Sequence, residues 1–465
     1  MSEKAQLLPQ STKPRPGRSA RVRPAHLLAL LAFSIGSLYC YTIHSAWTVR
    51  ALDPHERALR LLREQPIIDG HIDLPILARY VYANQVDSFD LRTATKGHVD
   101  IPRLRQGRVG GFFWSVFVPC PEDAGYPPDN EANFTTSTWR VRDTIEQIDV
   151  ATLLINKYSD TFELVANANQ FRRALHRGKI AAMLGVEGGH QLGSTLSTIR
   201  AYYTLGVRYI TLSHTCHNAL ADSCGSQGNE LASRWDGLSA FGHEAVREMN
   251  RLGMVVDVSH TSPKTASDAL TVSEAPVIFS HSNARGQHDA VRNIPDAILR
   301  RIGRIESNKA FNLTHDGEKG RGWGSDSGEI DKPVKAGDTI IMLNFSPDFV
   351  SESPDGSGRR ANASLVADHA DYIARLAGHK HVGIGSDFDG ILSTPEGLED
   401  VSAYPNLIAE LIRRGWTDED VKGLAGANLL RVLDKVEATA RHLRRTLPST
   451  KVFEGRTDLV PHDDL

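Results

Sequence analysis

The feature of this chain that most limits its fold is a series of short apolar runs that alternate with amphipathic stretches. Eight runs are predicted as strands, at residues 67–72, 111–118, 180–186, 209–213, 254–259, 276–280, 339–345 and 382–385. Several are nearly continuous in Val, Ile, Leu, Phe or Met, as expected of strands that are buried on both faces. Amphipathic segments such as residues 242–252 and 365–377 lie between them. The alternation predicts parallel β/α units, and eight such units predict an α/β fold in the form of a single, closed, TIM-like (β/α)8 barrel.

Polar side chains that can bind metals follow the ends of the predicted strands. In chain order they are His71, Asp73, Glu187, His214, His260, His281 and Asp387. In barrels of this kind the catalytic groups come from the carboxyl ends of several strands. His71 and Asp73 are two positions apart, so in an extended strand they would project to the same side and offer a metal two ligands. A single H-x-D triplet is more often a strand that runs into a polar turn, and the prediction of a site therefore depends on the whole set.

The charge balance argues against a nucleic-acid partner. The chain has 53 Lys and Arg residues against 56 Asp and Glu residues, a formal net charge of -3. No basic stripe occurs outside the N-terminal segment, whereas binding to a phosphate backbone needs clustered positive charge. The 465 residues are 40% hydrophobic, which is enough for the core of one large barrel.

The N-terminal segment predicts a membrane anchor. Residues 1–24 are polar and basic, as in a disordered cytosolic tail, and residues 25–43 contain no Asp, Glu, Lys or Arg. A helix of ~19 residues reaches about the thickness of the hydrocarbon core of a bilayer. A cleaved signal peptide and a buried core helix are alternatives, but the long basic tail and the lack of a clean A-x-A site favour an uncleaved signal anchor over residues 25–46. Because the basic residues precede the apolar run, the positive-inside rule predicts a single-pass type II membrane protein with a lumenal or extracellular catalytic domain.

Sequons and cysteines agree with such a compartment. Asn133, Asn312 and Asn362 are predicted glycosylation sites, whereas the sequon at Asn344 is discounted because it falls in a predicted strand. The four cysteines show no C-x-x-C spacing, which argues against a zinc knuckle or a dithiol redox site. If the chain is secreted, one disulfide is plausible.

Seven motifs then carry a resemblance to a known family. They are D-G-H-I-D-L-P at 69–75, G-V-E-G-G-H at 185–190, L-S-H-T-C at 212–216, D-V-S-H at 257–260, F-S-H-S at 279–282, R-N-I-P at 292–295 and G-S-D-F-D-G at 385–390. In this order, from about residue 60 to residue 440, the chain resembles the membrane (renal) dipeptidase family, a group of zinc peptidases with a barrel of the metallo-dependent hydrolase (amidohydrolase-like) type. The resemblance implies a catalytic barrel over residues 51–447, followed by a polar tail at 448–465.

The resemblance implies two zinc ions per chain and a role for each site residue. His71 and Asp73 would bind one zinc, His260 and His281 the other, and Glu187 would bridge both. His214 would contact the substrate and the developing oxyanion, and Arg292 would bind the carboxylate of the dipeptide. Asp387 would handle protons and the free amine. The implied reaction is hydrolysis of the peptide bond of a dipeptide by a hydroxide that bridges the two metals.

Further features follow from the same resemblance. Cys120 and Cys216 match a family disulfide, which leaves Cys224 free and Cys40 in the anchor. A homodimer is also implied. Residues 304–337 depart from the family pattern as a polar, glycine-rich insertion, which predicts a mobile loop away from the zinc ions.

Two other functions remain open at this point. One is another hydrolysis at a binuclear metal site, of a lactone or phosphoester or by deamination, in which a carboxylate-binding Arg292 would have little use. The other is a non-catalytic receptor built on the barrel, which the presence of all five ligands disfavours. Asp69 also has two interpretations, since it either orients His71 or simply ends the strand.

Overall fold

The computed structural model describes residues 34–37, 52–120, 139–226, 231–303, 334, 337–351, 358–454 and 456. The chain divides into two units, Met1–Asp53 and Pro54–Leu465. In the first unit, residues 34–37 are helical, so most of the anchor predicted at residues 25–46 lies outside the described residues. Among the helices within the described ranges, none is both long enough and apolar enough to cross a membrane. The tail at residues 1–24, nearly all of the insertion at 304–337, and the sequons at Asn133 and Asn312 also lie outside the described residues.

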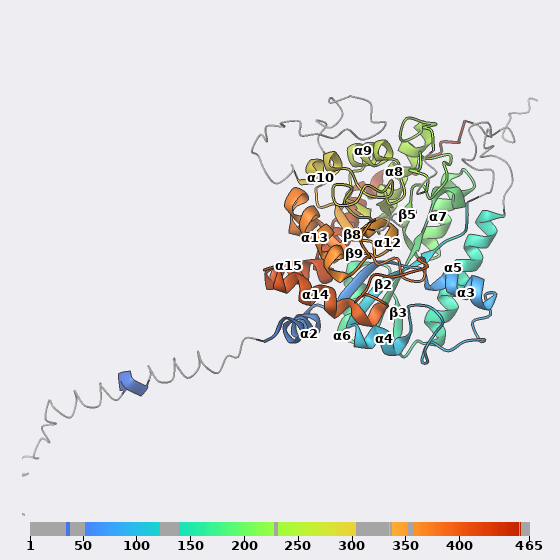
Figure 1. Ribbon diagram of the computed structural model, residues 1–465. Coiled ribbons are helices and arrows are strands. Elements are labelled where there is room, and N and C mark those ends of the chain that lie inside the picture. Colours follow the sequence, from blue (N-terminus) through green and yellow to red (C-terminus); the bar gives the residue numbers. More distant parts are fainter. Residues whose placement is uncertain are drawn as a thin grey trace, which may run out of the picture. The chain divides into compact units, whose positions relative to one another are not determined.

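Nine parallel strands are described in the second unit. They are β1 (Ile67–Ile72), β2 (Val109–Val116), β3 (Phe162–Leu164), β4 (Ile180–Val186), β5 (Val207–Thr211), β6 (Val255–Asp257), β7 (Val277–Phe279), β8 (Ile340–Leu343) and β9 (Val382–Ile384). The order β2-β1-β9-β8-β7-β6-β5-β4 is closed into a ring by the pairing of β2 with β4. The predicted eight-stranded parallel barrel is therefore confirmed (Figure 1).

The ninth strand, β3, was not predicted from the sequence. It pairs with the first half of β4, from Ile180 to Ala182, while β5 pairs with the second half of the same edge, from Leu184 to Val186. The tilt of barrel strands leaves that lower edge of β4 uncovered by β5, and β3 fills it. With only three residues and a Glu at its centre, β3 has no periodicity that a sequence pattern could reveal.

Helices follow each barrel strand and lie around the barrel (Figure 1). They are α2 (Pro54–Glu64), α3 (Leu74–Tyr82), α4 (Ile101–Gln106), α5 (Arg140–Lys157), α6 (Ala168–His176), α7 (Leu196–Thr204), α8 (Ala240–Leu252), α9 (Pro263–Val272), α10 (Asp296–Gly303), α12 (Pro347–Val350), α13 (Ala363–Ala377), α14 (Tyr404–Arg413), α15 (Asp418–Lys422) and α16 (Asn428–His442). Shorter helical turns are η1 (Gly189–Leu192), η2 (His379–His381), η3 (Val401–Ala403), η4 (Gly423–Ala427) and η5 (Leu443–Arg445).

Local sequence signals set the ends of these helices. The hydroxyl of Ser239 accepts a hydrogen bond from the backbone N–H of Gly242 over 2.9 Å and begins α8. Gly253 ends the same helix in the left-handed conformation, with φ 82°, which glycine adopts at little cost. The buried side chains of α8 include Phe241, Ala245 and Met249, which are four positions apart and therefore lie along one side of the helix.

The core consists of two clusters that alternate along the strands. In β4, Ala182 and Leu184 belong to the cluster that packs under the helices, whereas Ala181 and Met183 belong to the second cluster. Alternate residues of a strand point to opposite faces, so the strand residues of the second cluster fill the interior of the barrel; residues of α6 and α16 belong to the same cluster. All residues of β4 are buried, which explains why the strand reads as a continuous apolar run.

One irregularity in β1 decides where the first candidate ligand points. Asp69 pairs with Phe112 and Ile72 pairs with Trp114, so three steps along β1 match two steps along β2. The extra residue is a β-bulge, which redirects the side chains beside it. His71 lies within this bulge, and its direction therefore does not follow the simple alternation of an extended strand.

Candidate metal centre

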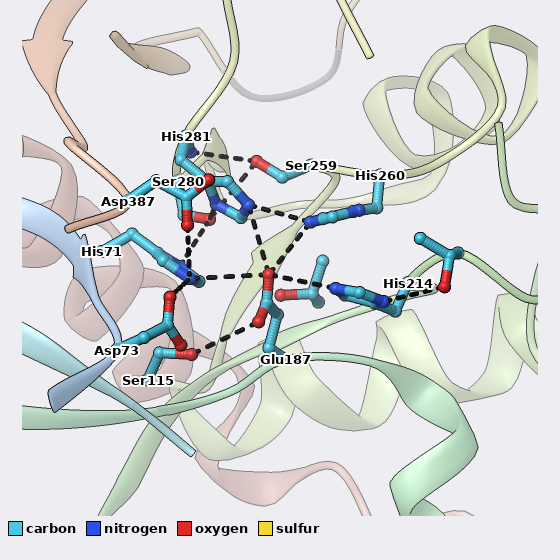
Figure 2. Close-up of polar contacts among 12 residues, drawn as sticks. His71, Asp73, Ser115, Glu187, His214, Ser259, His260, Ser280, His281 and Asp387 are labelled. Carbon is cyan, nitrogen blue, oxygen red and sulfur yellow. Dashed lines mark hydrogen bonds and ion pairs between the residues drawn. The ribbon is translucent and has the colours of Figure 1, made fainter. Parts of the chain in front are cut away.

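The carboxylate of Glu187 lies at the centre of the site, and four histidines surround it. Its Oε1 atom is 2.9 Å from His260 Nε2, 3.2 Å from His281 Nε2 and 3.5 Å from His71 Nε2. The Nε2 atom of His214 is 3.6 Å from the same oxygen (Figure 2). These side chains come from the carboxyl ends of β1, β4, β5, β6 and β7, so the barrel collects the predicted ligands at one end.

Asp73 and Asp387 complete the cluster on the side of His71. The Nε2 atom of His71 is 3.3 Å from Asp73 Oδ2 and 4.0 Å from Asp387 Oδ1. Asp73 directly follows β1 and occupies the N-cap position of α3, but its side chain makes no capping hydrogen bond there. It contacts His71, and Asp73 is therefore a site residue and not only a turn residue.

The site concentrates buried acidic groups. Burial raises the pKa of Glu187 and raises the pKa of Asp387 to about 8, although His71 acts in the opposite direction on both. Burial alone would lower the pKa of His71, but the negative charges of Glu187 and Asp73 hold it well above its usual value. A cation bound among these groups would relieve the repulsion between the carboxylates.

The donor atoms fit a metal ion on chemical grounds. His71 Nε2 and Asp73 Oδ1 are buried and have no hydrogen-bond partner among the described residues. The Nε2 atoms of His260 and His281 face each other over 2.9 Å, and both face Glu187, so their lone pairs converge. Three groups of potential ligand atoms each lie within 4.8 Å: His71, Glu187 and His281; Glu187, His214 and His260; and His71, Asp73 and Asp387. Imidazole nitrogens with carboxylate oxygens are the ligand set that zinc takes in hydrolases.

Two of the site residues have a strained backbone. His260 has φ 62° and Asp387 has φ 67°, values in the left-handed region that side chains other than glycine rarely adopt. Such conformations cost of order 1–3 kcal/mol each and persist where the surrounding structure holds them. Each residue lies three positions past the end of its strand, His260 after β6 and Asp387 after β9, and the turn in the backbone there directs its side chain toward Glu187 or His71.

His214 is held by its neighbours in the loop after β5. Its ring packs against the ring of Phe117, with centroids 4.5 Å apart, and its Nδ1 atom is 3.1 Å from the hydroxyl of Thr215. Cys216, two residues after His214, forms a disulfide with Cys120 in the loop after β2. The disulfide therefore ties the loop that carries His214 to the loop after β2. Cys224 takes no part in this disulfide.

Arg292 lies beside this cluster in the loop between β7 and α10. Its guanidinium donates to the carbonyl of His281 over 3.1 Å and to the hydroxyl of Ser282 over 3.4 Å. It also packs over the ring of Phe349, 5.3 Å from the centroid. Its Nε atom is buried without a hydrogen-bond partner among the described residues, so a donor remains for an anionic group.

Asp69 contacts the backbone of the site and not its imidazoles. Its carboxylate accepts hydrogen bonds from the backbone N–H of His71 over 2.8 Å and of Ser386 over 3.1 Å. The hydroxyl of Tyr404 donates to it over 2.6 Å. Of the two interpretations of Asp69, the structure favours orientation, because the side chain joins the bulge of β1 to the loop after β9 that carries Asp387.

Asn344 is a residue at this end of the barrel that the sequence did not predict as part of the site. The side-chain amide of Asn344 donates to Asp387 Oδ2 over 2.8 Å, and Asn344 is fully buried. In the sequence, Asn344 drew attention only as a sequon, and it was not predicted to be glycosylated because it falls in a predicted strand. Its position directly after β8 was the available signal, because every other barrel strand except β2 has a predicted site residue at or just beyond its end.

The sequence of the chain matches a known protein family. The family model for membrane dipeptidase (peptidase family M19) matches residues 55–309 and 331–446. The chain belongs to this family. The match is interrupted between residues 309 and 331, within the predicted insertion. The resemblance seen in the motifs is therefore confirmed.

Individual relatives agree with this family. Dipeptidase verJ from Clonostachys rogersoniana is 39% identical over 416 residues, which are 89% of this chain and 95% of that protein. A metallopeptidase from Rhodobacter sphaeroides, crystallised with a phosphinate mimic of the dipeptide L-Ala-D-Ala, has a TM-score of 0.63 and 23% identity, with 80% of this chain and 99% of that chain covered. The probable dipeptidase PvdM from Pseudomonas aeruginosa has a TM-score of 0.67 and 22% identity, with 83% of this chain and 99% of that chain covered. At these identities the two structures bear on the fold alone.

Membership of the membrane dipeptidase family makes this chain an enzyme, a metal-dependent dipeptidase. It removes the alternative of a non-catalytic receptor. The residues that the motifs singled out as ligands are the ones that the fold gathers around Glu187.

Proposed function

We propose that this dipeptidase hydrolyses its substrate at a site for two zinc ions that share the carboxylate of Glu187. His71 and Asp73 would hold one ion, and His260 and His281 would hold the other. The observation that carries the proposal is the convergence of these nitrogens on Glu187 Oε1, at 2.9 to 3.5 Å. Zinc lowers the pKa of bound water toward ~7 and polarises a carbonyl group, so two ions would supply a shared hydroxide as the nucleophile at neutral pH.

The residues around the metals would then guide the reaction. His214 points into the cluster, with its Nε2 atom 3.6 Å from Glu187 Oε1, where a ring N–H can donate to a developing oxyanion. Asp387 lies on the other side of the cluster, held by Asn344. A carboxylate at this place can accept a proton from the attacking water, pass it to the leaving amine, and bind the free amine of the substrate.

Arg292 would select substrates with a carboxylate one residue past the cut bond. Its charge lies close enough to the site to influence the pKa values of Glu187, His214, His260 and His281. A guanidinium pairs strongly with a carboxylate, and it is held here by Ser282, the His281 carbonyl and Phe349. This selects dipeptides over longer chains, and it argues against lactones and phosphoesters as substrates.

The metal site is tested by metal analysis combined with a dipeptide assay. The purified chain should contain two zinc ions, lose activity to a chelator and recover it with Zn²⁺. A phosphinate analogue of L-Ala-D-Ala should inhibit it. A double variant, His281→Ala with Glu187→Gln, that kept full activity would contradict the proposal.

The carboxylate contact is tested with a matched pair of arginine variants. Arg292→Met should raise KM for a dipeptide strongly and abolish the preference for the dipeptide over its C-terminal amide. Arg285→Met is the control, because Arg285 lies in the same loop and donates to the backbone carbonyl of Val291. Equal rates for the dipeptide and its amide in the wild-type enzyme would contradict the role of Arg292.

We also propose that the enzyme is a type II membrane protein with its barrel in the lumen or outside the cell. The support is the basic segment followed by the uncharged stretch at residues 25–43, together with the Cys120–Cys216 disulfide, which is typical of an oxidising compartment. Asn362, at the N-cap of α13, is the predicted glycosylation site within the described residues. Resistance of the full chain to alkaline extraction, and a mass shift on treatment with an N-glycosidase, are the expected results. Release by alkali would contradict the anchor.

A further inference from the structure

We propose that Asp257, acting through Ser280, is a positioning residue that fixes the ring proton of His281 and holds this imidazole ready to bind a metal. The inference rests on the proposed zinc site and adds to it a residue that does not touch the metal. It concerns a chain of hydrogen bonds that runs from the barrel interior to the site.

Asp257 is a fully buried carboxylate at the end of β6, and it receives four hydrogen bonds. Its Oδ1 atom accepts from the backbone N–H of Ser259 over 3.1 Å and of Ser280 over 2.9 Å. Its Oδ2 atom accepts from the hydroxyls of Ser280 and Thr211, both over 2.6 Å. An ionised carboxylate has only acceptor sites, and four donors satisfy a charge that would otherwise be costly to bury.

The hydroxyl of Ser280 links this carboxylate to the ring of His281 by two hydrogen bonds. The Ser280 hydroxyl has one proton, and the carboxylate at 2.6 Å is its strongest acceptor. The same oxygen is 2.8 Å from Nδ1 of His281 and must therefore act as an acceptor there (Figure 2). The ring proton of His281 is then on Nδ1. This tautomer leaves a lone pair on Nε2, the atom that faces Glu187 at 3.2 Å and His260 at 2.9 Å.

The backbone of this loop is held by the same group of residues. The hydroxyl of Ser259 accepts from the backbone N–H of His281 over 3.1 Å, and Arg292 donates to the His281 carbonyl over 3.1 Å. The position of His281 is therefore supported twice, whereas its ring proton depends on Ser280 alone among the described residues. Removal of the Ser280 hydroxyl should therefore affect the ring proton of His281 and leave the position of its backbone unchanged.

Substitution of Asp257 by Asn should reverse the donor and acceptor roles along the hydrogen bonds from residue 257 through Ser280 to His281. The two backbone N–H donors keep the amide oxygen at the Oδ1 position, so the amide NH₂ takes the Oδ2 position and donates to Ser280. The Ser280 hydroxyl must then donate to Nδ1 of His281, which moves the ring proton to Nε2. A protonated Nε2 cannot bind a metal, so Asp257→Asn should weaken metal binding more than Ser280→Ala does.

The test is a zinc titration of the full chain against a chromophoric chelator. Ser280→Ala should weaken one of the two zinc sites by about 10- to 100-fold, the range typical of residues that orient a metal-bound histidine. Asp257→Asn should weaken zinc binding at the same site more than Ser280→Ala does. Ser280→Thr keeps the hydroxyl and should bind zinc there as tightly as the wild type. The control is Thr211→Val, which removes an equally short hydrogen bond to the same oxygen of Asp257 but has no link to His281. It should leave both zinc affinities within about threefold.

Each outcome separates this inference from the proposed function. A wild-type chain that binds fewer than two zinc ions contradicts the binuclear site itself. Two ions in the wild type with unchanged affinity in Ser280→Ala, or an equal loss in Thr211→Val, overturns the role of Asp257 and leaves the site intact. A variant that fails to fold by circular dichroism is replaced by a measurement on the wild-type chain. Long-range ¹H–¹⁵N spectra of its histidines in the zinc-free state should place the proton of His281 on Nδ1, and a proton on Nε2 would overturn the inference.

Discussion

The side-chain amide of Asn344 donates a hydrogen bond to the carboxylate of Asp387 over 2.8 Å, from the end of β8 to the loop after β9. The two residues follow neighbouring strands, and Asp387 has a left-handed backbone conformation. The amide therefore fixes one carboxylate oxygen, while the other faces His71 at 4.0 Å. Asn344 thus holds Asp387 with its Oδ1 atom toward the candidate metal centre.

Asn344→Ala should lower kcat and leave KM for a dipeptide within about threefold. A hydrogen bond to a charged group contributes about 1.5–3 kcal/mol, which corresponds to a loss of about 10- to 100-fold in kcat. Steady-state kinetics measure this. Asn406→Ala is the control, because the exposed Asn406 donates to the carbonyl of Gly397, on the surface and away from Asp387 along the chain. An unchanged kcat in Asn344→Ala would show that Asp387 keeps its position without the amide.

Gly390→Ala should remove activity without unfolding the chain. A Cβ atom at Gly390 would lie 2.2 Å from Asp73 Oδ2 and 2.7 Å from Asp387 Oδ1, so both carboxylates must move. A displacement of about 1 Å in a catalytic group can cost about 100-fold in rate. The measurements are kcat/KM and the zinc content of the purified variant.

The control for this variant is Gly415→Ala. Gly415 has φ 91° and nothing within 4 Å of an added Cβ, so this substitution strains the backbone but touches no site residue. It should lower stability by about 1 kcal/mol and keep full activity. Normal zinc content and activity in Gly390→Ala would mean that the loop yields to the added methyl group.

Loss of the disulfide should reduce both stability and activity. The bond joins cysteines 96 residues apart, and cross-links that close loops of this length contribute about 2–5 kcal/mol. A Cys120→Ser, Cys216→Ser variant should lose about this free energy of unfolding in urea, and its kcat should fall because the loop that carries His214 is released. Cys224→Ser is the matched control, because it also replaces a cysteine by serine but leaves the Cys120–Cys216 bond in place. Full activity in the double variant would indicate that Phe117 and Thr215 hold His214 without the disulfide.

His369 should make the fold less stable in mild acid. Its Nδ1 atom accepts from the backbone N–H of Ala284 over 3.2 Å, and its Nε2 atom donates to the carbonyl of Val350 over 2.9 Å. Burial lowers the pKa of His369 from 6.5 to about 4. Above pH 6.5 the ring is neutral in the folded and the unfolded chain. As the pH falls from 6.5 toward 4, only the unfolded chain takes up the proton, so stability is lost across this window.

At about pH 5 this loss amounts to about 2 kcal/mol for His369. The free energy of unfolding in urea should be measured near pH 7 and near pH 5 for both proteins. The loss between the two pH values should be about 2 kcal/mol smaller in His369→Gln than in the wild type. The comparison between the two proteins cancels the contribution of the other histidines. Equal pH dependence in both would mean that His369 takes up a proton in the folded chain.

Much of the barrel and of the site could be predicted from the sequence, because both depend on local patterns. A strand that is buried on both faces reads as an apolar run, and a polar residue just past its end marks the catalytic face of the barrel. His260 and His281 were found in this way, and so was Glu187. The same pattern gave no sign of β3, which has three residues and takes its place only from the uncovered edge of β4.

The direction of individual side chains was beyond these patterns. His71 and Asp73 were expected to share one face of a straight strand, but β1 contains a bulge and Asp73 lies past its end. The two side chains are nevertheless in contact, with His71 Nε2 3.3 Å from Asp73 Oδ2, although they do not alternate along a regular strand. Strand alternation predicted the right neighbours for a reason that does not hold in the structure.

The amino-acid sequence by itself determined the number of barrel strands, the residues at their ends and the family of the enzyme. Only the tertiary structure decided which of these residues support one another: Asn344 with Asp387, Tyr404 with Asp69, and Asp257 with Ser280 and His281. The physical reason is separation along the chain. Tyr404 and Asp69 are 335 positions apart, and their contact exists only because the barrel closes in one register. Local periodicity carries no information about that register, which the packing of the whole core selects.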